Sequence, residues 1–276
     1  MRRESYWQKA LEQTNLSIHK NGLYPLDTKV VTEEFYDKND FIIRKLDTSK
    51  FKKIINYGPK QNPFSPWEKI LEIDKIGNNH QLILNKYPVQ KGHILLITNS
   101  WKPQNGWLDI NDWVAIQKVN KDTSGLWFFN SSPIAGASQP HRHLQLLRRS
   151  HGEVSCPREK WFLNLEIRND NETKLKKSIV VSRFNFLEDS SYIYNLYLEL
   201  TKKIGLGDPI NDEKPRYPHN ILITNNWIAI IRRRFDHLHG VSVNGLGFAG
   251  YLLLTEKSNI HYLKTRGPEK LLENFV

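Results

Sequence analysis

The residues whose types and spacing could do chemistry lie between His141 and Gln145. On an extended strand, side chains alternate between faces, so His141, His143 and Gln145 share one face while Leu144 and Leu146 point into the core. A neutral imidazole can attack phosphorus near pH 7. A backbone carbonyl near His141 is the expected acceptor for the other ring nitrogen, and a glutamine can hold a phosphate oxygen. The segment predicts His143 as the nucleophile of nucleotidyl transfer, with Gln145 on the phosphate and His141 in support.

The loop before this segment, Gly136-Ala137-Ser138-Gln139, consists of small and amide residues. Small residues let backbone N–H groups approach a phosphate closely, and Ser138 and Gln139 add side-chain donors. We therefore expect this loop to hold the phosphate that His143 attacks.

Two imidazoles on one strand face also suit zinc, which is the main alternative. Cys156 is the only cysteine, so carboxylates would have to complete such a site. The segment His237-Leu238-His239 has the same spacing but lacks both the following glutamine and the preceding loop. We interpret His237 and His239 as structural or peripheral, and this contrast favours catalysis over metal binding at the first pair. No metal site is expected.

Composition limits the classes of partner. The chain has 276 residues with 40 Lys plus Arg against 29 Asp plus Glu, a formal charge of +11. A basic balance favours anionic partners, but the lysines are scattered and residues 232–234 form the only dense run. A small polyanion is thus favoured over nucleic acid. No apolar run approaches the roughly 20 residues that cross a bilayer, and no signal peptide opens the sequence, so we expect a cytoplasmic protein without membrane contact.

Hydrophobic periodicity indicates the elements that must position the site. Helical spacing predicts helices over 4–20, over 109–121 and from a cap at Asp189 or Ser190 to a stop at Gly205. Apolar runs predict strands over 41–44, 70–73, 80–87, 92–98, 126–130, 141–148, 219–224, 227–232, 241–244 and 250–255. The fold class is α+β with antiparallel sheet and packed helices. The two halves resemble each other weakly, each with an apolar hairpin, a helix, strands and a His-x-His, which suggests degenerate duplication. We predict domains at 1–185, a catalytic N-terminal part, and 186–276, a C-terminal part that completes the nucleotide site.

The pattern of Asn130 followed by the residues from Gly136 to Gln145 resembles the signature of the diadenosine tetraphosphate phosphorylases, also called ATP adenylyltransferases. These belong to the histidine-triad superfamily with the galactose-1-phosphate uridylyltransferases. Residues 84–96 resemble the family's nucleotide-binding hairpin, 58–64 its lysine segment and 244–250 its C-terminal segment. Gln145 in place of a third histidine favours transfer over hydrolysis. Ser132 departs from the expected glycine.

The resemblance implies a histidine-triad-like fold and a two-step reaction without a bound cofactor. His143 attacks an α-phosphate of diadenosine tetraphosphate and expels ATP, and inorganic phosphate then takes the adenylyl group as ADP. Mg²⁺ with the polyphosphate is plausible. Further residues that the resemblance assigns to the substrate are Lys60, Asn85, Lys86, Asn130, Gly136, Ala137, Ser138, Gln139 and, from the C-terminal half, Asn220 and Arg232.

Two alternatives stay open. Another nucleotidyltransferase of the same scaffold, with a sugar-1-phosphate acceptor, depends on pocket shape, which the sequence does not show. A basic nucleic-acid-binding protein is supported by charge alone, since aromatic RNA-recognition motifs and zinc knuckles are absent.

Overall fold

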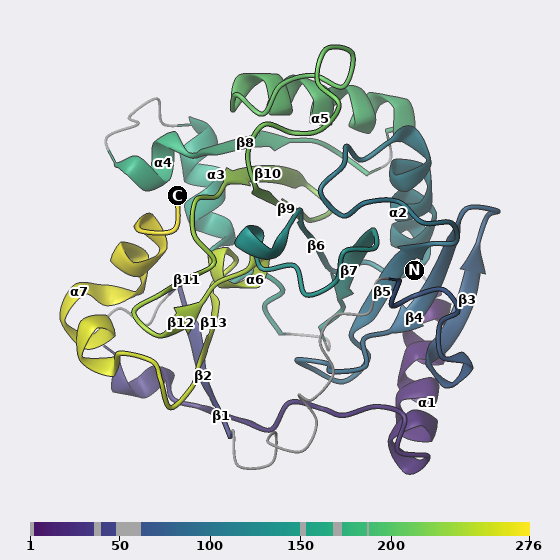
Figure 1. Cartoon of the computed structure of the whole chain (residues 1–276), viewed down its shortest axis with the longest axis horizontal. Coiled ribbons are helices and arrows are strands. Elements are labelled where there is room, and N and C mark those ends of the chain that lie inside the picture. Colours follow the sequence, from purple (N-terminus) through teal and green to yellow (C-terminus); the bar gives the residue numbers. More distant parts are fainter. Residues whose placement is uncertain (1–2, 36–39, 48–61, 150–152, 168–172, 187) are drawn as a thin grey trace.

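A computed structural model of the chain describes residues 3–35, 40–47, 62–149, 153–167, 173–186 and 188–276 (Figure 1). Its centre is an eight-stranded sheet in the order β3-β4-β5-β7-β6-β9-β10-β8, in which all neighbours are antiparallel. The strands are β3 (Glu72–Ile76), β4 (His80–Leu84), β5 (Ile94–Thr98), β6 (Leu126–Asn130), β7 (His143–Leu147), β8 (Ile179–Arg183), β9 (His219–Ile223) and β10 (Trp227–Arg232).

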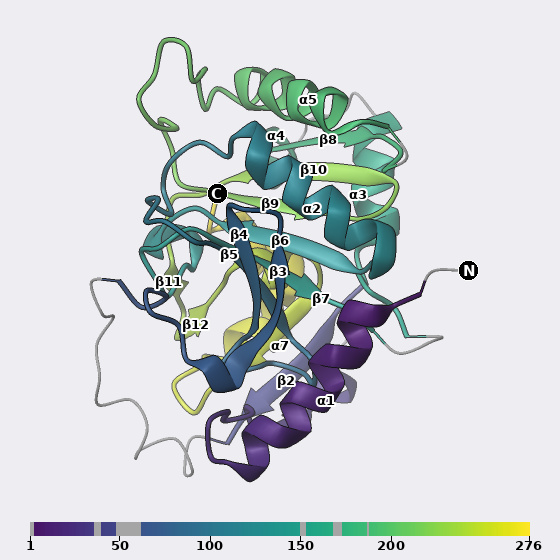
Figure 2. The same cartoon turned by 90° about the vertical axis from the view of Figure 1, so that its right-hand side faces the viewer.

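Helices cover both faces of this sheet. On one face, which we call the helical face, lie α1 (Ser5–His19), α2 (Ile110–Asp122) and α5 (Ser190–Lys203), and Figure 2 shows α2 and α5 side by side there. The opposite face, the site face, carries a second apolar cluster under α3 (Glu159–Ile167), α4 (Lys174–Lys177), α6 (Gly245–Phe248) and α7 (Ile260–Glu273). None of the described helices is long and apolar enough to cross a membrane.

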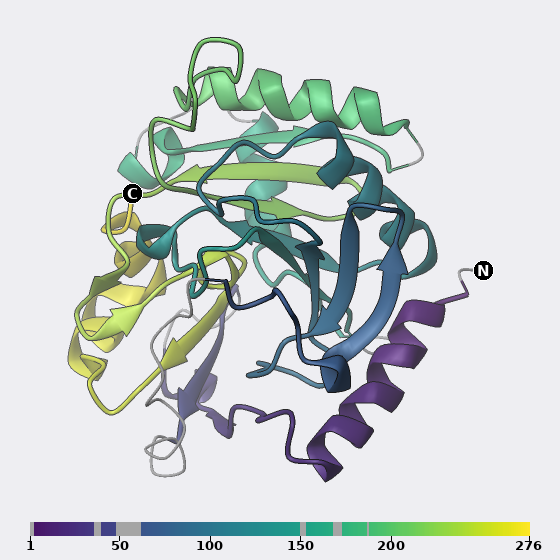
Figure 3. The same ribbon diagram turned by 45° about the vertical axis from the view of Figure 1, so that its right-hand side comes forward.

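A small sheet on the site face pairs strands from the N-terminal and C-terminal parts of the chain. Its order is β1 (Thr28–Val30), β2 (Ile42–Leu46) and β13 (Tyr251–Leu254), and β2 runs parallel to β13. A two-stranded ribbon, β11 (His237–Leu238) with β12 (Val241–Ser242), lies before α6. Figure 3 shows α1 and α7 on opposite sides of the molecule.

The predicted elements form because their ends are capped and their apolar sides are buried. Asp109 accepts a hydrogen bond from the Asn111 N–H and forms a capping box with Asp112, which opens α2 where the sequence predicted a helix. Asp189 caps α5 by accepting a hydrogen bond from the Tyr192 N–H. The predicted helix over 4–20 is confirmed as α1 and the hairpin at 219–232 as β9–β10. The strand predicted over 70–73 begins later, because Lys69–Leu71 forms a 3₁₀ turn before β3.

The internal repeat matches different elements of the two halves from those that the sequence suggested. The units that repeat are a strand, a helix and a hairpin: β5-α2-β6-β7 and β8-α5-β9-β10. In the sheet their orders mirror each other about the β6–β9 pair, and α2 packs on α5. The partner of the β9–β10 hairpin is therefore β6–β7, not β4–β5, and the second His-x-His lies beyond β10, outside the repeat. The domain boundary at residue 185 stays a prediction, since strands from both sides of it share one sheet.

Candidate active site

Strand β7 places His143 and Gln145 on the site face, as the alternation predicted. Gln145 pairs with Phe128 of the site-face cluster, whereas Leu144 and Leu146 belong to the cluster of the helical face. A cavity of about 420 Å³, here called the nucleophile cavity, opens over both polar residues. Its apolar walls come from the segment after Asn62 and from β4 and β5, including Pro63, Phe64, Trp67, Ile83 and Leu95.

The ring of His143 is held in one orientation. Its Nδ1 lies 2.8 Å from the carbonyl oxygen of His141, and a carbonyl can only accept, so Nδ1 carries the proton and Nε2 the lone pair. Phe64 packs edge-on against the ring with 5.5 Å between centroids. The predicted carbonyl acceptor is confirmed. Burial lowers the pKa of His143 to about 4, although the bond to the His141 carbonyl opposes this shift, so the imidazole is neutral near pH 7.

Gln104 holds the backbone of His143 where β6 and β7 stop pairing. The ladder between these strands ends at Phe128 and Gln145. Beyond that point the buried Gln104 side chain accepts from the His143 N–H at 2.8 Å and donates to the carbonyl oxygens of His143 at 3.1 Å and of Asn130 at 2.7 Å. The Gln104 carboxamide thus lies between β6 and β7 like a strand residue. It separates the two segments and hydrogen-bonds to the main chain of both.

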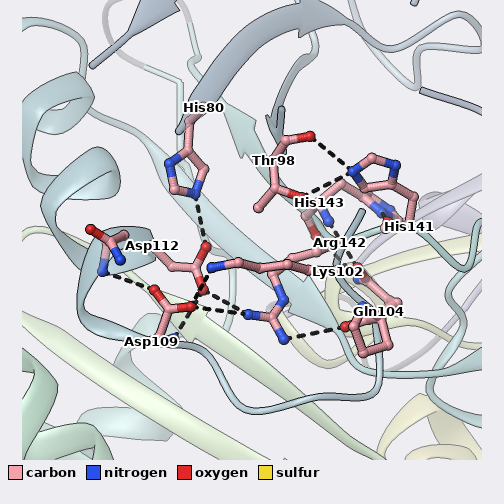
Figure 4. A network of polar contacts seen from close by, with 11 residues as sticks. His80, Thr98, Lys102, Gln104, Asp109, Asp112, His141, Arg142 and His143 are labelled. Atoms are coloured by element: carbon pink, nitrogen blue, oxygen red, sulfur yellow. Dashed lines mark hydrogen bonds and ion pairs between the residues drawn. The ribbon is translucent and has the colours of Figure 1, made fainter. Parts of the chain in front are cut away.

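Behind the nucleophile, a buried ionic network anchors the start of β7 to α2 (Figure 4). Arg142, between the two histidines, donates to Asp112 at 3.0 Å, and His80 Nε2 lies 2.8 Å from the other oxygen of the same carboxylate. Asp109 binds Lys102 at the edge of this group. Because the same two aspartates cap α2, the strand register and the helix start are fixed together.

His141 uses both ring nitrogens for structure. Nε2 lies 2.8 Å from the Thr98 carbonyl oxygen, and Nδ1 lies 2.7 Å from the side-chain oxygen of Asn62. It therefore ties β5 to the segment that covers the nucleophile cavity. Within the described ranges, no group of three or more His, Cys, Asp or Glu side chains is arranged to hold a metal ion. Lys60, predicted to neutralise the phosphates, lies outside the described residues.

The predicted phosphate loop uses some of its donors internally. The N–H groups of Gly136 and Ala137 bind the carbonyls of Pro133 and Ser132 at 2.8 and 2.9 Å, so they shape the turn. Ser138 and Gln139 line the nucleophile cavity. Gly136 has φ +88°, and a Cβ there would lie 2.5 Å from the Cβ of Asn244. The loop therefore packs directly against the C-terminal half.

Asn130 and Asn220 form the base of that loop. Asn130 Oδ1 accepts from Asn220 at 2.8 Å and from the Gly245 N–H at 2.9 Å, and Asn220 also donates to the Ala135 carbonyl at 2.8 Å. Arg233, fully buried, donates to the Asn220 oxygen at 2.7 Å. The Asn130 Nδ2 is buried, has no protein partner within the part of the chain that the structure describes, and does not line the nucleophile cavity.

The hairpin residues predicted for the nucleotide, Asn85 and Lys86, line the nucleophile cavity. Lys86 pairs with Glu68 at its rim, with 2.5 Å between Nζ and the carboxylate. Asn85 Nδ2 lies 3.4 Å from Nδ1 of the buried His93, which stands beside Gln145. Burial lowers the pKa of His93 to about 3. The neutral His93 ring thus lies between Asn85 of the hairpin and Gln145.

Six of the predicted site residues do not line the nucleophile cavity: Asn130, Gly136, Ala137, His141, Asn220 and Arg232. The Arg232 guanidinium lies over the Tyr217 ring at 4.7 Å and does not line the cavity. His237 is exposed in β11, and His239 stacks on Tyr262 with 3.8 Å between ring centroids. Sequence reasoning missed Gln104, His93 and Arg233. Only His93 had a usable signal, as a polar residue that opens the apolar run of β5.

Comparisons with known proteins show the family of the chain. A family model described as the Ap4A phosphorylase N-terminal domain matches residues 1–160, and one described as the ATP adenylyltransferase C-terminal domain matches residues 171–276. Diadenosine 5',5'''-P1,P4-tetraphosphate phosphorylase 2 of Saccharomyces cerevisiae is 24% identical over 234 residues, covering 74% of this chain and 71% of that protein.

Solved structures show the same fold. A yeast Ap4A phosphorylase in complex with AMP matches with a TM-score of 0.72, covering 99% of this chain and 98% of that one. The same enzyme in complex with Ap4A matches with a TM-score of 0.71, covering 100% and 97%. Both are 19% identical to this chain.

Proposed function

The chain belongs to the Ap4A phosphorylase family, and from this premise we propose that it converts diadenosine tetraphosphate and inorganic phosphate into ATP and ADP through an adenylyl group on His143. It is an enzyme of the nucleotidyltransferase class. The observation that carries the residue assignment is the hydrogen bond from His143 Nδ1 to the His141 carbonyl, because it leaves Nε2 as the free nucleophile in the cavity.

The reaction has two balanced steps. In the first, the Nε2 lone pair of His143 forms a bond to an α-phosphorus while the bond from that phosphorus to the bridging oxygen breaks, and ATP leaves. In the second, an oxygen of inorganic phosphate attacks the same phosphorus, the N–P bond breaks, and ADP leaves with His143 neutral again. The carbonyl of His141 stabilises the cationic ring between the steps.

The other residues of the proposed site bind and orient the charged phosphates and the nucleotide. Gln145 and Ser138 donate to phosphate oxygens, Asn130 supports the phosphate loop from below, and Lys60 neutralises the polyphosphate. Asn85, Lys86 and the apolar walls hold the nucleotide of the reacting half. His141 and Asn220 act through the segments that they tie down. Two solved structures of one relative, in complex with AMP and with Ap4A, support nucleotides as ligands.

The test measures phosphate-dependent turnover in the wild type and in a variant in which His143 is replaced. Incubation with diadenosine tetraphosphate and phosphate is expected to release equal amounts of ATP and ADP, measured by chromatography. His143→Ala removes the nucleophile, and we expect it to lower kcat by about 10³-fold or more. In the wild type without phosphate, the covalent adenylyl adduct accumulates on a peptide containing His143, which mass spectrometry identifies.

The matched control is His237→Ala, which removes an exposed histidine of the same spacing outside the cavity. It should keep wild-type turnover. Equal losses in both variants contradict the nucleophile assignment, and AMP release without phosphate dependence indicates a hydrolase.

We propose that Mg²⁺ binds together with the polyphosphate substrate. Turnover measured with and without a chelator tests this. A cytoplasmic location fits substrates that are soluble nucleotides, and fractionation of cells tests it.

A further inference from the structure

The buried histidine that precedes β5, His93, has no part in the reaction as proposed so far. Its carbonyl oxygen accepts from the Asn85 N–H at 2.8 Å, so these two residues lie opposite each other on neighbouring segments. On its other side, Leu95 is paired with Gln145, which makes His93 and Gln145 diagonal neighbours on one face, within reach of long side chains. The His93 ring lies 6.0 Å from that of Phe128, the partner of Gln145 in β6.

A chain of hydrogen bonds determines which nitrogen of the His93 ring carries the proton. The Tyr87 N–H donates to the side-chain oxygen of Asn85 at 3.0 Å, so the nitrogen of the same carboxamide is the atom that faces the ring. This Nδ2 lies 3.4 Å from His93 Nδ1. Because an amide nitrogen can only donate, Nδ1 carries the lone pair and the neutral ring has its proton on Nε2. The tautomer of His93 is therefore the opposite of that of His143.

The Nε2 proton of His93 needs an acceptor inside the protein. Nε2 is buried and has no hydrogen bond of ordinary geometry to the described residues, and the side chain that lies against it is that of Gln145. Leaving a buried N–H unpaired is costly. In a carboxamide only the oxygen accepts, so the Nε2 proton is satisfied when Gln145 Oε1 turns towards His93. This orientation leaves the Gln145 nitrogen for the nucleophile cavity, which Gln145 lines.

We propose that His93 is a positioning residue, which orients the Gln145 carboxamide so that its N–H faces the phosphate that His143 attacks. The proposal rests on the proposed function, since it explains how one phosphate-binding group of that reaction is held. A carboxamide has nearly the same shape when its oxygen and nitrogen are exchanged, so packing alone selects its orientation poorly. An oxygen facing the phosphate would repel it, whereas a donor already in place needs no reorientation when charge develops in the transition state.

The first test determines the tautomers and needs no turnover. In protein labelled with nitrogen-15 at histidine, a long-range proton–nitrogen correlation spectrum at neutral pH distinguishes a protonated ring nitrogen from one with a lone pair. We expect the proton of His93 on Nε2 and that of His143 on Nδ1, with the signals assigned from variants that lack each ring. A proton on Nδ1 of His93 overturns the proposal.

The second test measures the energetic coupling between His93 and Gln145. His93→Leu removes the donor to the carboxamide, and we expect kcat to fall about tenfold while KM for diadenosine tetraphosphate changes by less than about threefold. His93→Gln supplies an N–H near the place of Nε2 and should restore kcat to within about threefold of the wild type. In a Gln145→Ala background no carboxamide is left to orient, so His93→Leu should change kcat there by less than about twofold.

The matched control is His219→Leu, which removes another fully buried histidine that does not line the nucleophile cavity. It should lose stability and keep kcat. Equal losses from His93→Leu in both backgrounds, or no recovery in His93→Gln, mean that His93 only maintains the fold and overturn the positioning role. If the wild type forms no ATP and ADP from diadenosine tetraphosphate and phosphate, the proposed function fails instead, and the tautomer of His93 then still confirms or overturns the hydrogen-bond chain.

Discussion

At the scale of single residues, the tautomer and charge of the proposed nucleophile, His143, are set by groups that do not line the nucleophile cavity. The His141 carbonyl selects the tautomer, and burial keeps the ring uncharged. Gln104 fixes the main chain from which the ring projects. A nucleophile must approach phosphorus along one line, and a misplacement of about 1 Å can cost 10²-fold in rate. Gln104 is therefore a positioning residue for the reaction.

This role predicts the effect of Gln104→Glu, which keeps the shape and the acceptor but removes the donor to the carbonyls of His143 and Asn130. We expect kcat to fall about 10- to 100-fold, while KM for diadenosine tetraphosphate changes by less than about threefold, because Gln104 does not line the nucleophile cavity. Steady-state kinetics with the two parameters measured separately checks this.

Gln117→Glu is the control for general damage. Gln117 is also buried and also donates to main-chain carbonyls, those of Phe186 and Glu188, but it belongs to α2 on the helical face. Its variant should lose stability comparably and keep kcat. If both variants lose kcat alike, or if Gln104→Glu raises KM alone, the positioning role is wrong.

Residue types near the nucleophile could be predicted because strand alternation and a small-residue loop are local patterns. His143, Gln145 and Ser138 were found in this way, and the structure brings them to one cavity. Gln104 could not be found, because its importance comes from a gap between two strands that the sequence does not reveal. Arg232 was chosen over Arg233 in a run of three arginines, and only the end of β10 decides which of them turns inward.

At the scale of elements, the phosphate loop depends on a contact between chain halves. Gly136 adopts a positive φ and packs its Cα against Asn244. Gly136→Ala introduces a methyl group where the neighbouring atoms include the Asn244 main chain at 2.8 Å, so the loop must shift. We expect kcat/KM to fall about 10- to 100-fold, measured with diadenosine tetraphosphate and phosphate.

Gly77→Ala separates this contact from backbone strain. Gly77 also has a positive φ, +59°, but a Cβ there meets nothing within 4 Å. Both variants should lose about 1–2 kcal/mol of stability from the left-handed conformation, and only the Gly136 variant should lose activity. Retention of full activity by Gly136→Ala contradicts the docking of the loop.

Elements with regular periodicity were predicted well, and those with local interruptions were not. The helices α1, α2 and α5 each bury one continuous stripe. Helix α7 was missed because Gly267, with non-helical φ and ψ, and Pro268 interrupt it. The pairing of β2 with β13 joins residues more than two hundred positions apart, and no local pattern specifies it.

At the scale of the whole molecule, three buried histidines link folding to pH. Burial lowers the pKa of His93 to about 3 and those of His143 and His219 to about 4, whereas an unfolded histidine titrates near 6.5. Between these values the unfolded chain binds more protons than the folded one. The free energy of unfolding therefore falls as pH is lowered from about 6.5 towards 4, by up to about 1.4 kcal/mol per pH unit for each histidine.

Urea unfolding at pH 7, 6 and 5 checks this dependence, with a progressively lower midpoint expected. His219→Leu, which removes a histidine of the helical-face side packed on Phe129, should reduce the slope while keeping the nucleophile intact. A free energy of unfolding that stays constant or rises between pH 7 and pH 5 contradicts the argument.

The pairing of β6 with β9 has a consequence for how the protein is made. During translation β6 and His143 leave the ribosome well before Asn220 and Arg233, which hold the base of the phosphate loop. Until then one edge of β6 is an open row of hydrogen-bonding groups, which is prone to pair with other chains. The nascent polypeptide thus carries the proposed nucleophile for a period in which the phosphate loop has no base, and we expect competence to transfer a nucleotide to arise only after Asn220, Arg233 and Gly245 have been synthesised.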